Sequence, residues 1–432
     1  MSLLLHSGCE VRWYRAPALI ARSLSRLSPY GRELPAEFWF LWLGTVINRL
    51  GGFAVPFLML YLTAKRQMDP ATAALFVSVL GAGSFVAQLV GGEVADRFGR
   101  RPVLLFSLFA APVAMLSLGV VREPWLIAVA MFALGFLTDL FRPAMSAAVV
   151  DLVPADRRTR AFGYIYWAIN LGAAAAPVVA GLMANFDYFL LFLGDAVTTA
   201  VFGVIVLLRV PETQSADHAR DARAANTRGR AGQALRDPML LFFFILSLAV
   251  GVIYSQSHVT LPLDMAAAGL PPSDYGLAIA VNGALIVLIT LQVTRFLERF
   301  PRYAVMALAA LLLGAGFGLT ELASTLPLYA LTVVIWTLGE VIGAAVAPVI
   351  VSEMSPAALR GLYQGIWGAS WGLAFFIGPV LGGFVLHNYG SAVLWGGAFV
   401  LGIAIALGFL ALSIPARRRA RQVVAPAASP SD

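Results

Sequence analysis

The stretch GEVADRFGRR, from Gly92 to Arg101, ends one long apolar run, residues 71–94, and leads into another, residues 102–120. Each run is long enough for a helix to cross the hydrocarbon core of a bilayer, which takes about 20 residues. Glycine lets the backbone turn tightly, and arginines at the ends of apolar runs are typical of a membrane surface. The stretch therefore predicts a short, charged turn between two membrane-spanning helices.

Apolar runs of this kind recur along the chain. Hydrophobic residues make up 60% of the 432 residues and charged residues only 12%, which leaves too little polar surface for a soluble domain. No run alternates apolar and polar residues as the strands of a membrane barrel would. We therefore expect an all-α membrane protein with about twelve transmembrane helices. Their expected spans are 37–63, 71–94, 102–120, 125–150, 161–184, 188–209, 238–263, 274–296, 302–320, 326–351, 361–386 and 391–414.

The basic residues are divided unequally between the two sides of these spans. Of the 30 basic residues, 25 fall on the side of the two termini and 3 on the other side, while Arg49 and Arg142 lie inside spans. Because basic loops stay in the cytoplasm, both termini are expected to be cytoplasmic, in a multi-pass protein of a bacterial cell membrane. No single basic stripe indicates a nucleic-acid partner.

Similar residues recur in the two halves of the chain at an offset of 202 residues. The triplet 96–98 (DRF) falls on 298–300 (ERF), and Asp151 falls on Glu353. Two halves in one orientation imply a pseudo-two-fold axis along the membrane normal, with the pathway between them. The expected division is a cytoplasmic N-terminal segment 1–36, a six-helix bundle 37–209, a cytoplasmic linker 210–237, a second six-helix bundle 238–414 and a disordered cytoplasmic tail 415–432. The linker is either a short surface helix or a flexible connection.

The turn from Gly92 to Arg101 carries a recognisable pattern. With Gly92, Asp96, Gly99 and the arginines that flank them, it resembles G-x-x-x-D-R-x-G-R-R, the signature between helices 2 and 3 in the major facilitator superfamily. The resemblance implies that superfamily's fold and a cytoplasmic gate, in which Asp96 meets the start of helix 11 while the transporter is open to the outside. The gate residues it implies are Gly92, Asp96, Arg97, Gly99, Arg100, Arg101 and Asp151.

Helices 5 and 11 share a second pattern of small residues and proline. It resembles the superfamily's antiporter motif, G-x8-G-x3-G-P-x2-G-G, with alanine in place of two glycines in helix 5. Small residues permit close helix crossings, so the pattern indicates either an export-specific hinge or ordinary packing. Its residues are Gly163, Gly172, Pro177, Gly181, Gly365, Gly378, Pro379 and Gly383.

Charge is costly and usually functional inside a membrane span. Five Asp, Glu or Arg residues lie inside the expected spans away from their ends: Arg49, Asp139, Arg142, Asp195 and Glu340. Glu340 has no basic neighbour on its own helix, so it is the first candidate for a proton carrier. Asp139 lies three residues from Arg142 on one helix face, so it either neutralises that arginine or carries a proton. Asp195 is the third acidic candidate, and either Asp195 or Glu340 is expected to hold Arg49.

Polar and aromatic residues of helices 5, 7, 8 and 11 are candidates for the substrate pathway, or for hydrogen bonds between helices. The order LPLDMAAAGL–YGLAIAVNG, and GEVIGAAVAP–SEMSPAALRGLYQG further on, resembles the multidrug-type exporters of the superfamily. The resemblance implies a small organic substrate. The candidates are Trp167, Tyr254, Gln256, His258, Asn282, Trp367 and Trp371.

Several functions are excluded or ranked by what the sequence contains. It has no GxxxxGK[ST] phosphate loop for ATP. Its single cysteine, Cys9, and its scattered histidines indicate no metal site. We therefore expect the protein to have no cofactor and no metal, and not to be an enzyme. Three functions remain: a proton-driven exporter of small organic molecules, an importer or facilitator of a nutrient, and a non-transporting receptor or scaffold. The gate and helix 5 motifs favour transport, and Glu340 favours proton-driven export, with the chain working as a monomer.

Overall fold

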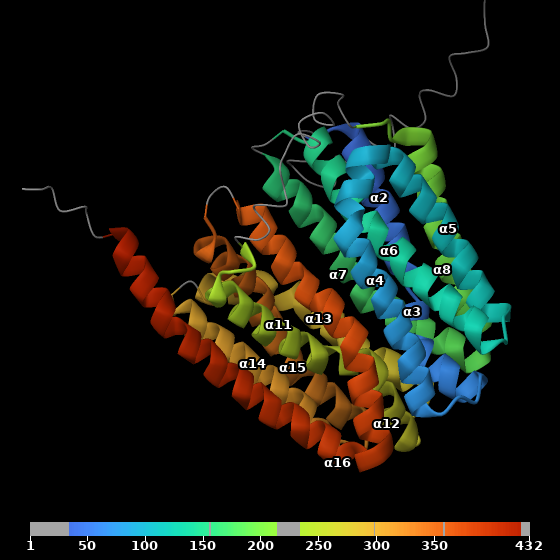
Figure 1. Cartoon of the computed structure of the whole chain (residues 1–432). Coiled ribbons are helices and arrows are strands. Elements are labelled where there is room, and N and C mark those ends of the chain that lie inside the picture. The colour runs from blue at the N-terminus through green and yellow to red at the C-terminus, as the bar shows by residue number, and fades with distance from the viewer. Residues whose placement is uncertain (1–33, 155–156, 214–233, 298, 357–358, 425–432) are drawn as a thin grey trace, which may run out of the picture.

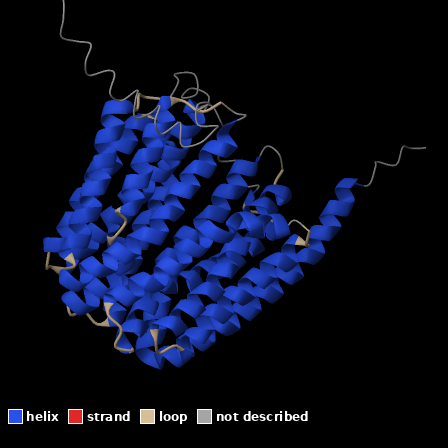
Figure 2. Ribbon diagram, turned by 180° about the vertical axis from the view of Figure 1, so that it is seen from behind, coloured by secondary structure: helices blue, strands red, loops and turns tan. Residues whose placement is uncertain are grey.

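The computed structural model describes residues 34–154, 157–213, 234–297, 299–356 and 359–424 (Figure 1). Within these ranges all regular structure is helical (Figure 2). The N-terminal half consists of α2 (Ala36–Leu50), α3 (Ala54–Leu60), η2 (Tyr61–Lys65), α4 (Pro70–Phe98), α5 (Arg100–Val120), α6 (Pro124–Leu152), α7 (Arg158–Phe186) and α8 (Phe189–Arg209). The C-terminal half consists of α11 (Pro238–Val259), α12 (Leu261–Ala267), α13 (Pro272–Leu297), α14 (Arg302–Leu319), η4 (Thr320–Leu322), α15 (Leu326–Met354) and α16 (Arg360–Val424).

Eleven of the described helical stretches are long and apolar enough to cross a membrane. The last of them, Leu362–Ala416, is long enough for two crossings and bends at Gly390, whose φ of +83° suits glycine. Counted on either side of this bend, the crossings agree with the expected twelve. The helix continues through Pro415 to Val424, so the prediction of a disordered tail is wrong for residues 415–424.

The first and seventh spans are interrupted, although each was expected to be one continuous helix. α2 ends at Leu50, and the chain passes through Gly51 and Gly52 before α3 begins. α11 ends at Val259, and α12 follows after Thr260. Interrupted helices are tolerated in membranes where other protein groups satisfy the freed backbone atoms.

The internal repeat extends to the helix boundaries. Pro70 and Pro272 open α4 and α13, and Arg100 and Arg302 open α5 and α14. In both pairs the offset is the 202 residues seen in the sequence. The N-terminal half, blue to green in Figure 1, therefore lies beside a C-terminal half, yellow to red, that repeats its helix order.

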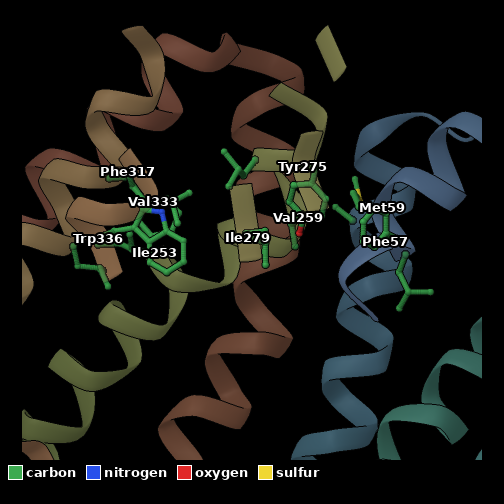
Figure 3. Packing of buried hydrophobic residues seen from close by; sticks show 14 of the residues in the cluster. Phe57, Met59, Ile253, Val259, Tyr275, Ile279, Phe317, Val333 and Trp336 are labelled. Atoms are coloured by element: carbon green, nitrogen blue, oxygen red, sulfur yellow. The ribbon is translucent and has the colours of Figure 1, made fainter. Parts of the chain in front are cut away.

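The halves contact each other mainly through α7 on α13 and α4 on α16. At one end of the molecule they also meet through α3, where the rings of Phe57 and Tyr275 lie 5.2 Å apart (Figure 3). Gly383 packs there against Ala74 of α4, and Gly181 against Ser273 of α13. This end is therefore closed.

The opposite end, called the basic end below, carries the α4–α5 and α13–α14 turns with their arginines. A side-chain carbon added at Gly92, Gly163, Gly365 or Gly368, toward this end, would meet no described residue within 4 Å. The contacts between the halves named above are thus tight at the first end, whereas these four glycines toward the basic end face open space.

Candidate functional site

The carboxyl group of Glu340 lies on α15 and is held by two neutral hydrogen-bond donors. Asn282 Nδ2, from α13, donates to one oxygen at 2.6 Å, and Tyr254 Oη, from α11, donates to the other at 3.1 Å. The Asn282 amide also donates to Thr337 Oγ1 at 3.0 Å. No described basic group pairs with Glu340. A carboxyl group in such surroundings can exchange a proton, because charging it in an apolar interior is costly.

Aromatic rings enclose the Tyr254 side of this carboxyl group. Trp336 and Trp371 contact the Tyr254 ring edge-on, each with centroids 5.8 Å away, and Phe375 and His258 lie at 6.3 Å. Nδ1 of His258 is buried and has no hydrogen-bond partner among the described residues. The site thus combines one acid with flat apolar surfaces, the usual lining of a pocket for an organic molecule.

The other pathway candidates lie outside this cluster. Gln256 donates to the backbone oxygen of Gly378 at 2.9 Å and fastens α11 to α16. Trp167 stacks on Trp42 at 6.0 Å, within an aromatic cluster of α2 and α7. Trp367, also on α16, has its indole nitrogen buried without a partner among the described residues.

A second charged group lies in the N-terminal half. Asp139 and Arg142 form an ion pair within α6 at 2.6 Å, and Gln88 of α4 donates to Asp139 at 3.3 Å. The Arg142 side chain is 63% exposed, whereas that of Asp139 is 12% exposed. Both oxygens of Asp139 therefore already accept from donors, as the salt-bridge interpretation of this pair expected.

Arg49 lies near the end of α2, directly before the interruption. Gly172 of α7 allows the backbone at Arg49 to approach, because a side-chain carbon at position 172 would lie 2.5 Å from the Arg49 carbonyl oxygen. The Arg49 Nε atom is buried and has no hydrogen-bond partner among the described residues. Neither Asp195 nor Glu340 forms a described ion pair with it.

Asp195 of α8 binds the chain where the first span is interrupted. Its Oδ2 accepts from the backbone N–H of Ala54, the first residue of α3, at 3.3 Å, and Thr199 donates to Oδ1 at 3.4 Å. A carboxylate in this position satisfies a free N–H at a helix start. The sequence placed Asp195 among the proton carriers, and the structure gives it this capping contact.

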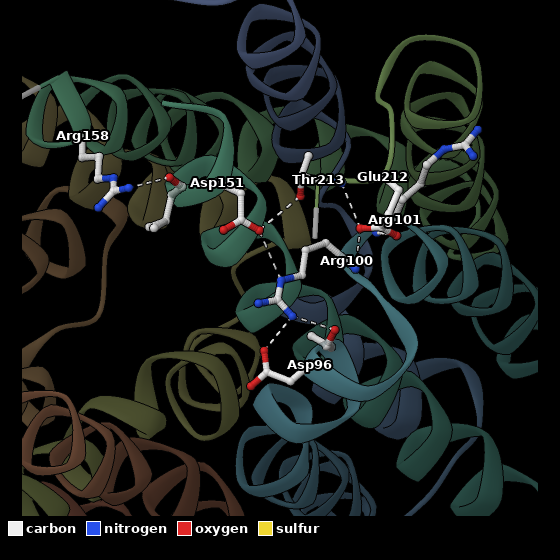
Figure 4. Close-up of polar contacts among 9 residues, drawn as sticks. Asp96, Arg100, Arg101, Asp151, Arg158, Glu212 and Thr213 are labelled. Carbon is white, nitrogen blue, oxygen red and sulfur yellow. Dashed lines mark hydrogen bonds and ion pairs between the residues drawn. The ribbon is translucent and has the colours of Figure 1, made fainter. Parts of the chain in front are cut away.

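The gate residues form a network at the basic end (Figure 4). Arg100 binds Asp96 at 2.6 Å and Asp151 at 3.4 Å, so it links the α4–α5 turn to the end of α6. The helix expected to face Asp96 begins at Arg360, and residues 357–358, directly before it, lie outside the described ranges. The pairing of Asp96 with helix 11 therefore stays a prediction.

Glu212, which the sequence did not single out, completes this network. Its two oxygens accept from the backbone N–H groups of Arg100 and Arg101 at 3.1 and 3.2 Å, at the free N-terminus of α5. Gly99 precedes them with φ +98°, and a side-chain carbon there would lie 2.5 Å from a Glu212 oxygen. The backbone conformation therefore favours glycine at this position, and a larger residue would also displace the Glu212 carboxylate.

The C-terminal half has a corresponding pair, in which Arg302 binds Glu353. Both residues lie 202 positions after Arg100 and Asp151. Another acidic group that the sequence did not identify is Asp264 of α12, which accepts from Tyr329 at 2.7 Å and Trp395 at 3.2 Å. It fastens α12 to α15 and α16.

The small residues of helices 5 and 11 divide into two groups. Gly172, Gly181, Gly378 and Gly383 sit in crossings too close for a larger residue, and the backbone oxygen of Pro177 meets Gly276 of α13. Gly163 and Gly365, toward the basic end, meet no described residue. Packing therefore accounts for the first group and leaves Gly163 and Gly365 unexplained.

Two repeated six-helix halves around an acid in a membrane interior define a membrane transport protein. The family model described as Major Facilitator Superfamily matches residues 41–265 and 257–430. The chain belongs to the major facilitator superfamily, a family of membrane transporters.

Relatives in this superfamily differ in what they are named for. The uncharacterized MFS-type transporter YqjV of Bacillus subtilis is 25% identical, with 82% of this chain and 87% of the relative covered. The Na(+), Li(+), K(+)/H(+) antiporter of Planococcus maritimus is 24% identical, over 75% and 83%. The multidrug resistance protein MdtH of Escherichia coli is 23% identical, over 89% and 96%.

Solved structures share the fold at lower identity. A POT family transporter in complex with 5-aminolevulinic acid gives a TM-score of 0.75 at 18% identity, over 91% of this chain and 99% of that one. The nucleoside transporter NupG gives 0.74 at 16% identity, over 87% and 98%. These similarities show the fold. The substrate and the direction of transport have to be inferred from the residues of the site.

Proposed function

We propose that this protein exports small organic molecules in exchange for protons, by alternating access in the cell membrane. The observation that carries the proposal is the Glu340 carboxyl group, held by Asn282 and Tyr254 and by no described cation. Protonated, it is neutral and cheap to keep in the membrane interior; ionised, it attracts a cationic group of a substrate. Proton and substrate then compete for one site, which couples their movements.

The distribution of basic residues supports a cytoplasmic basic end and two cytoplasmic termini. With this orientation the described conformation is open to the cytoplasm and closed to the outside. Alternating access would then open the Phe57–Tyr275 end and close the basic end around the same central site. In the described conformation Arg100 binds Asp96 and Asp151 within the N-terminal half, and closing the gate would bring this network to the C-terminal half. The protein is expected to work as a monomer.

The test uses purified protein in liposomes that contain a pH-sensitive dye. Ethidium, a fluoroquinolone, a dipeptide and a nucleoside are added in turn, and proton movement is recorded with compound movement. The wild type should exchange at least one compound for protons. Movement of proton and compound in the same direction would favour the importer, and no proton movement with any compound would refute proton coupling.

The variant Glu340→Gln should lose uphill transport driven by a pH gradient and keep downhill exchange of the compound, because the amide stays neutral. Asp139→Asn is the rival, and the exposed Glu123→Gln is the control. Uphill transport by Glu340→Gln, together with its loss in Asp139→Asn, would assign the proton to the other acid.

A further inference from the structure

We propose that the central site binds amphipathic zwitterions, with the anionic group of the molecule at Arg49 and Arg142 and its amino group at Glu340. The inference rests on the proposed function, which supplies the competition between an amino group and the proton at Glu340. It adds a second anchor, in the other half of the protein, and so names the class of substrate.

Arg49 has no ion-pair or hydrogen-bond partner among the side chains that the structure describes. Its Nε atom is buried without a hydrogen bond among the described residues, and the charged groups that act on it most strongly are Arg142, Asp139 and Asp195. Asp139 already binds Arg142 and Gln88, and Asp195 already caps α3. Arg49 is only partly exposed, and a guanidinium withdrawn from water is costly unless it is paired, so one further anion would stabilise this group.

The place of Arg49 relative to Glu340 follows from the contacts of α7. Gly172 of α7 packs on the Arg49 backbone, and the next residues, Ala173 and Ala174, pack on Gly283 of α13. Gly283 follows Asn282, which donates to Glu340. Arg49 and Glu340 therefore flank a single crossing between the halves, one from each side.

A second crossing repeats this relation. The Gln88 amide, which donates to Asp139, lies 3.1 Å from the position of a side-chain carbon at Gly372 of α16. The neighbouring Trp371 packs on Tyr254, which donates to Glu340. At the first contact, Arg49 lies on the side of the N-terminal half and Asn282, a donor to Glu340, on the other side. At the second contact, Gln88, which binds the partner of Arg142, faces the segment of Trp371, which packs on the other donor, Tyr254.

A molecule with one charge of each sign fits this arrangement better than one with a single charge. A simple cation would neutralise Glu340 and leave Arg49 unpaired, and a simple anion would bind Arg49 opposite an ionised Glu340. A zwitterion satisfies both groups, and its apolar body has the rings of Tyr254, Trp371 and Phe375 to pack against. Charge-assisted hydrogen bonds to a guanidinium add both affinity and orientation.

The test compares four probes that share one fluorophore and differ in charge. They are Nε-dansyl-lysine, a zwitterion; dansylcadaverine, a cation; dansylglycine, an anion; and dansylamide, which is neutral. Saturable energy transfer from tryptophan to dansyl is measured for protein in lipid nanodiscs. The wild type should bind the zwitterion most tightly. Arg49→Gln should weaken its binding roughly tenfold or more, the loss of one charge-assisted hydrogen bond, while Arg122→Gln, in an exposed loop, should change nothing.

Two further variants keep the result interpretable. Arg49→Lys retains the charge and should recover part of the affinity, and Arg142→Gln tests the second arginine if Arg49→Gln does not fold. Preference for the cation in the wild type, or zwitterion binding unaffected by both arginine variants, would overturn the proposal. Such a result with intact proton exchange leaves the exporter standing, whereas arginine-dependent binding without proton exchange refutes the exporter and keeps the site.

Discussion

The two halves of this protein share their helices but not their buried charges. At positions 202 residues apart, Arg49 and Gly172 correspond to Gly251 and Ala374, which also pack against each other. Glu340 corresponds to Thr138 of α6. The N-terminal half has Arg49, Asp139, Arg142 and Asp195 where the C-terminal half has Gly251, Val341, Ala344 and Gly397.

The shared part of the two halves is their contact with each other. Gly81 of α4 packs on the backbone at Phe375, and Gly283, its counterpart in α13, packs on the backbone at Ala173. Positions 375 and 173 are also 202 residues apart. The contact surfaces between the halves are therefore nearly symmetric, whereas the groups proposed to bind proton and substrate are asymmetric.

The largest effect should come from breaking that symmetric contact. Gly81→Leu and Gly283→Leu each place a side chain where the other half's backbone lies, so both should disfavour the described conformation. Overpacking of this kind costs about 1–3 kcal/mol, which shifts a conformational equilibrium roughly 5- to 150-fold. Transport should fall in both variants to a similar degree.

The shift is measured with spin labels at Phe98→Cys and Phe300→Cys, a corresponding pair in the two basic-end turns, in a Cys9→Ser background. Both glycine variants should shorten the distance between the labels as the basic end closes. Gly368→Leu is the control, because a side-chain carbon there meets no described residue within 4 Å. If only one of the two variants shifts the distance, the two contacts are not equivalent in gating.

Much of this fold could be predicted from the sequence, because the bilayer imposes its thickness on each helix. Runs of apolar residues predicted most helices within a few residues. The repeat also aligned Asp151 with Glu353, and both residues bind an arginine at the basic end. The interruption of the first span was missed, although Gly51 and Gly52 were a visible signal. Glycine pairs also occur in continuous helices, so the letters alone do not decide.

The site was less predictable because its partners are distant in the chain. Glu340 could be identified as a lone acid, but its donors Asn282 and Tyr254 lie 58 and 86 residues away. Asp195 was interpreted as a proton carrier because its position in an apolar run is visible, whereas its contact with Ala54, 141 residues away, is not. Glu212 was missed because it lies in a polar segment where acids are common.

The next effect concerns the gate. Asp96→Asn keeps the shape of the α4–α5 turn and removes the charge that Arg100 binds at 2.6 Å. Transport in liposomes should fall several-fold, because charge-assisted hydrogen bonds are roughly twice as strong as neutral ones. The amount of protein in the membrane should stay unchanged. Transport at the wild-type rate would show that Asp96 is a surface charge without a gating role.

Asp195 distinguishes a structural charge from a coupling charge in the N-terminal half. Asp195→Asn keeps an oxygen that accepts from the Ala54 N–H, so uphill transport should continue. Asp195→Ala removes the cap and should lower stability by about 0.5–2 kcal/mol, seen as a lower unfolding temperature in detergent. Loss of uphill transport in Asp195→Asn, at wild-type stability, would make Asp195 a proton carrier after all.

The smallest effect should come from the basic-end ion pair of the C-terminal half. Arg302 and Glu353 repeat the pair of Arg100 and Asp151, but the Arg302 side chain is 49% exposed and that of Arg100 only 10%. An exposed pair contributes about 0–1 kcal/mol, whereas an unsatisfied buried charge costs about 1–3 kcal/mol or more. Glu353→Gln should therefore leave the unfolding temperature nearly unchanged, and Asp151→Asn should lower it, although Asp96 still binds Arg100. Equal losses of stability in the two variants would mean that the different burial of the two ion pairs has no effect on their contributions. The two halves would then be symmetric in the stability of these ion pairs as well as in their helices.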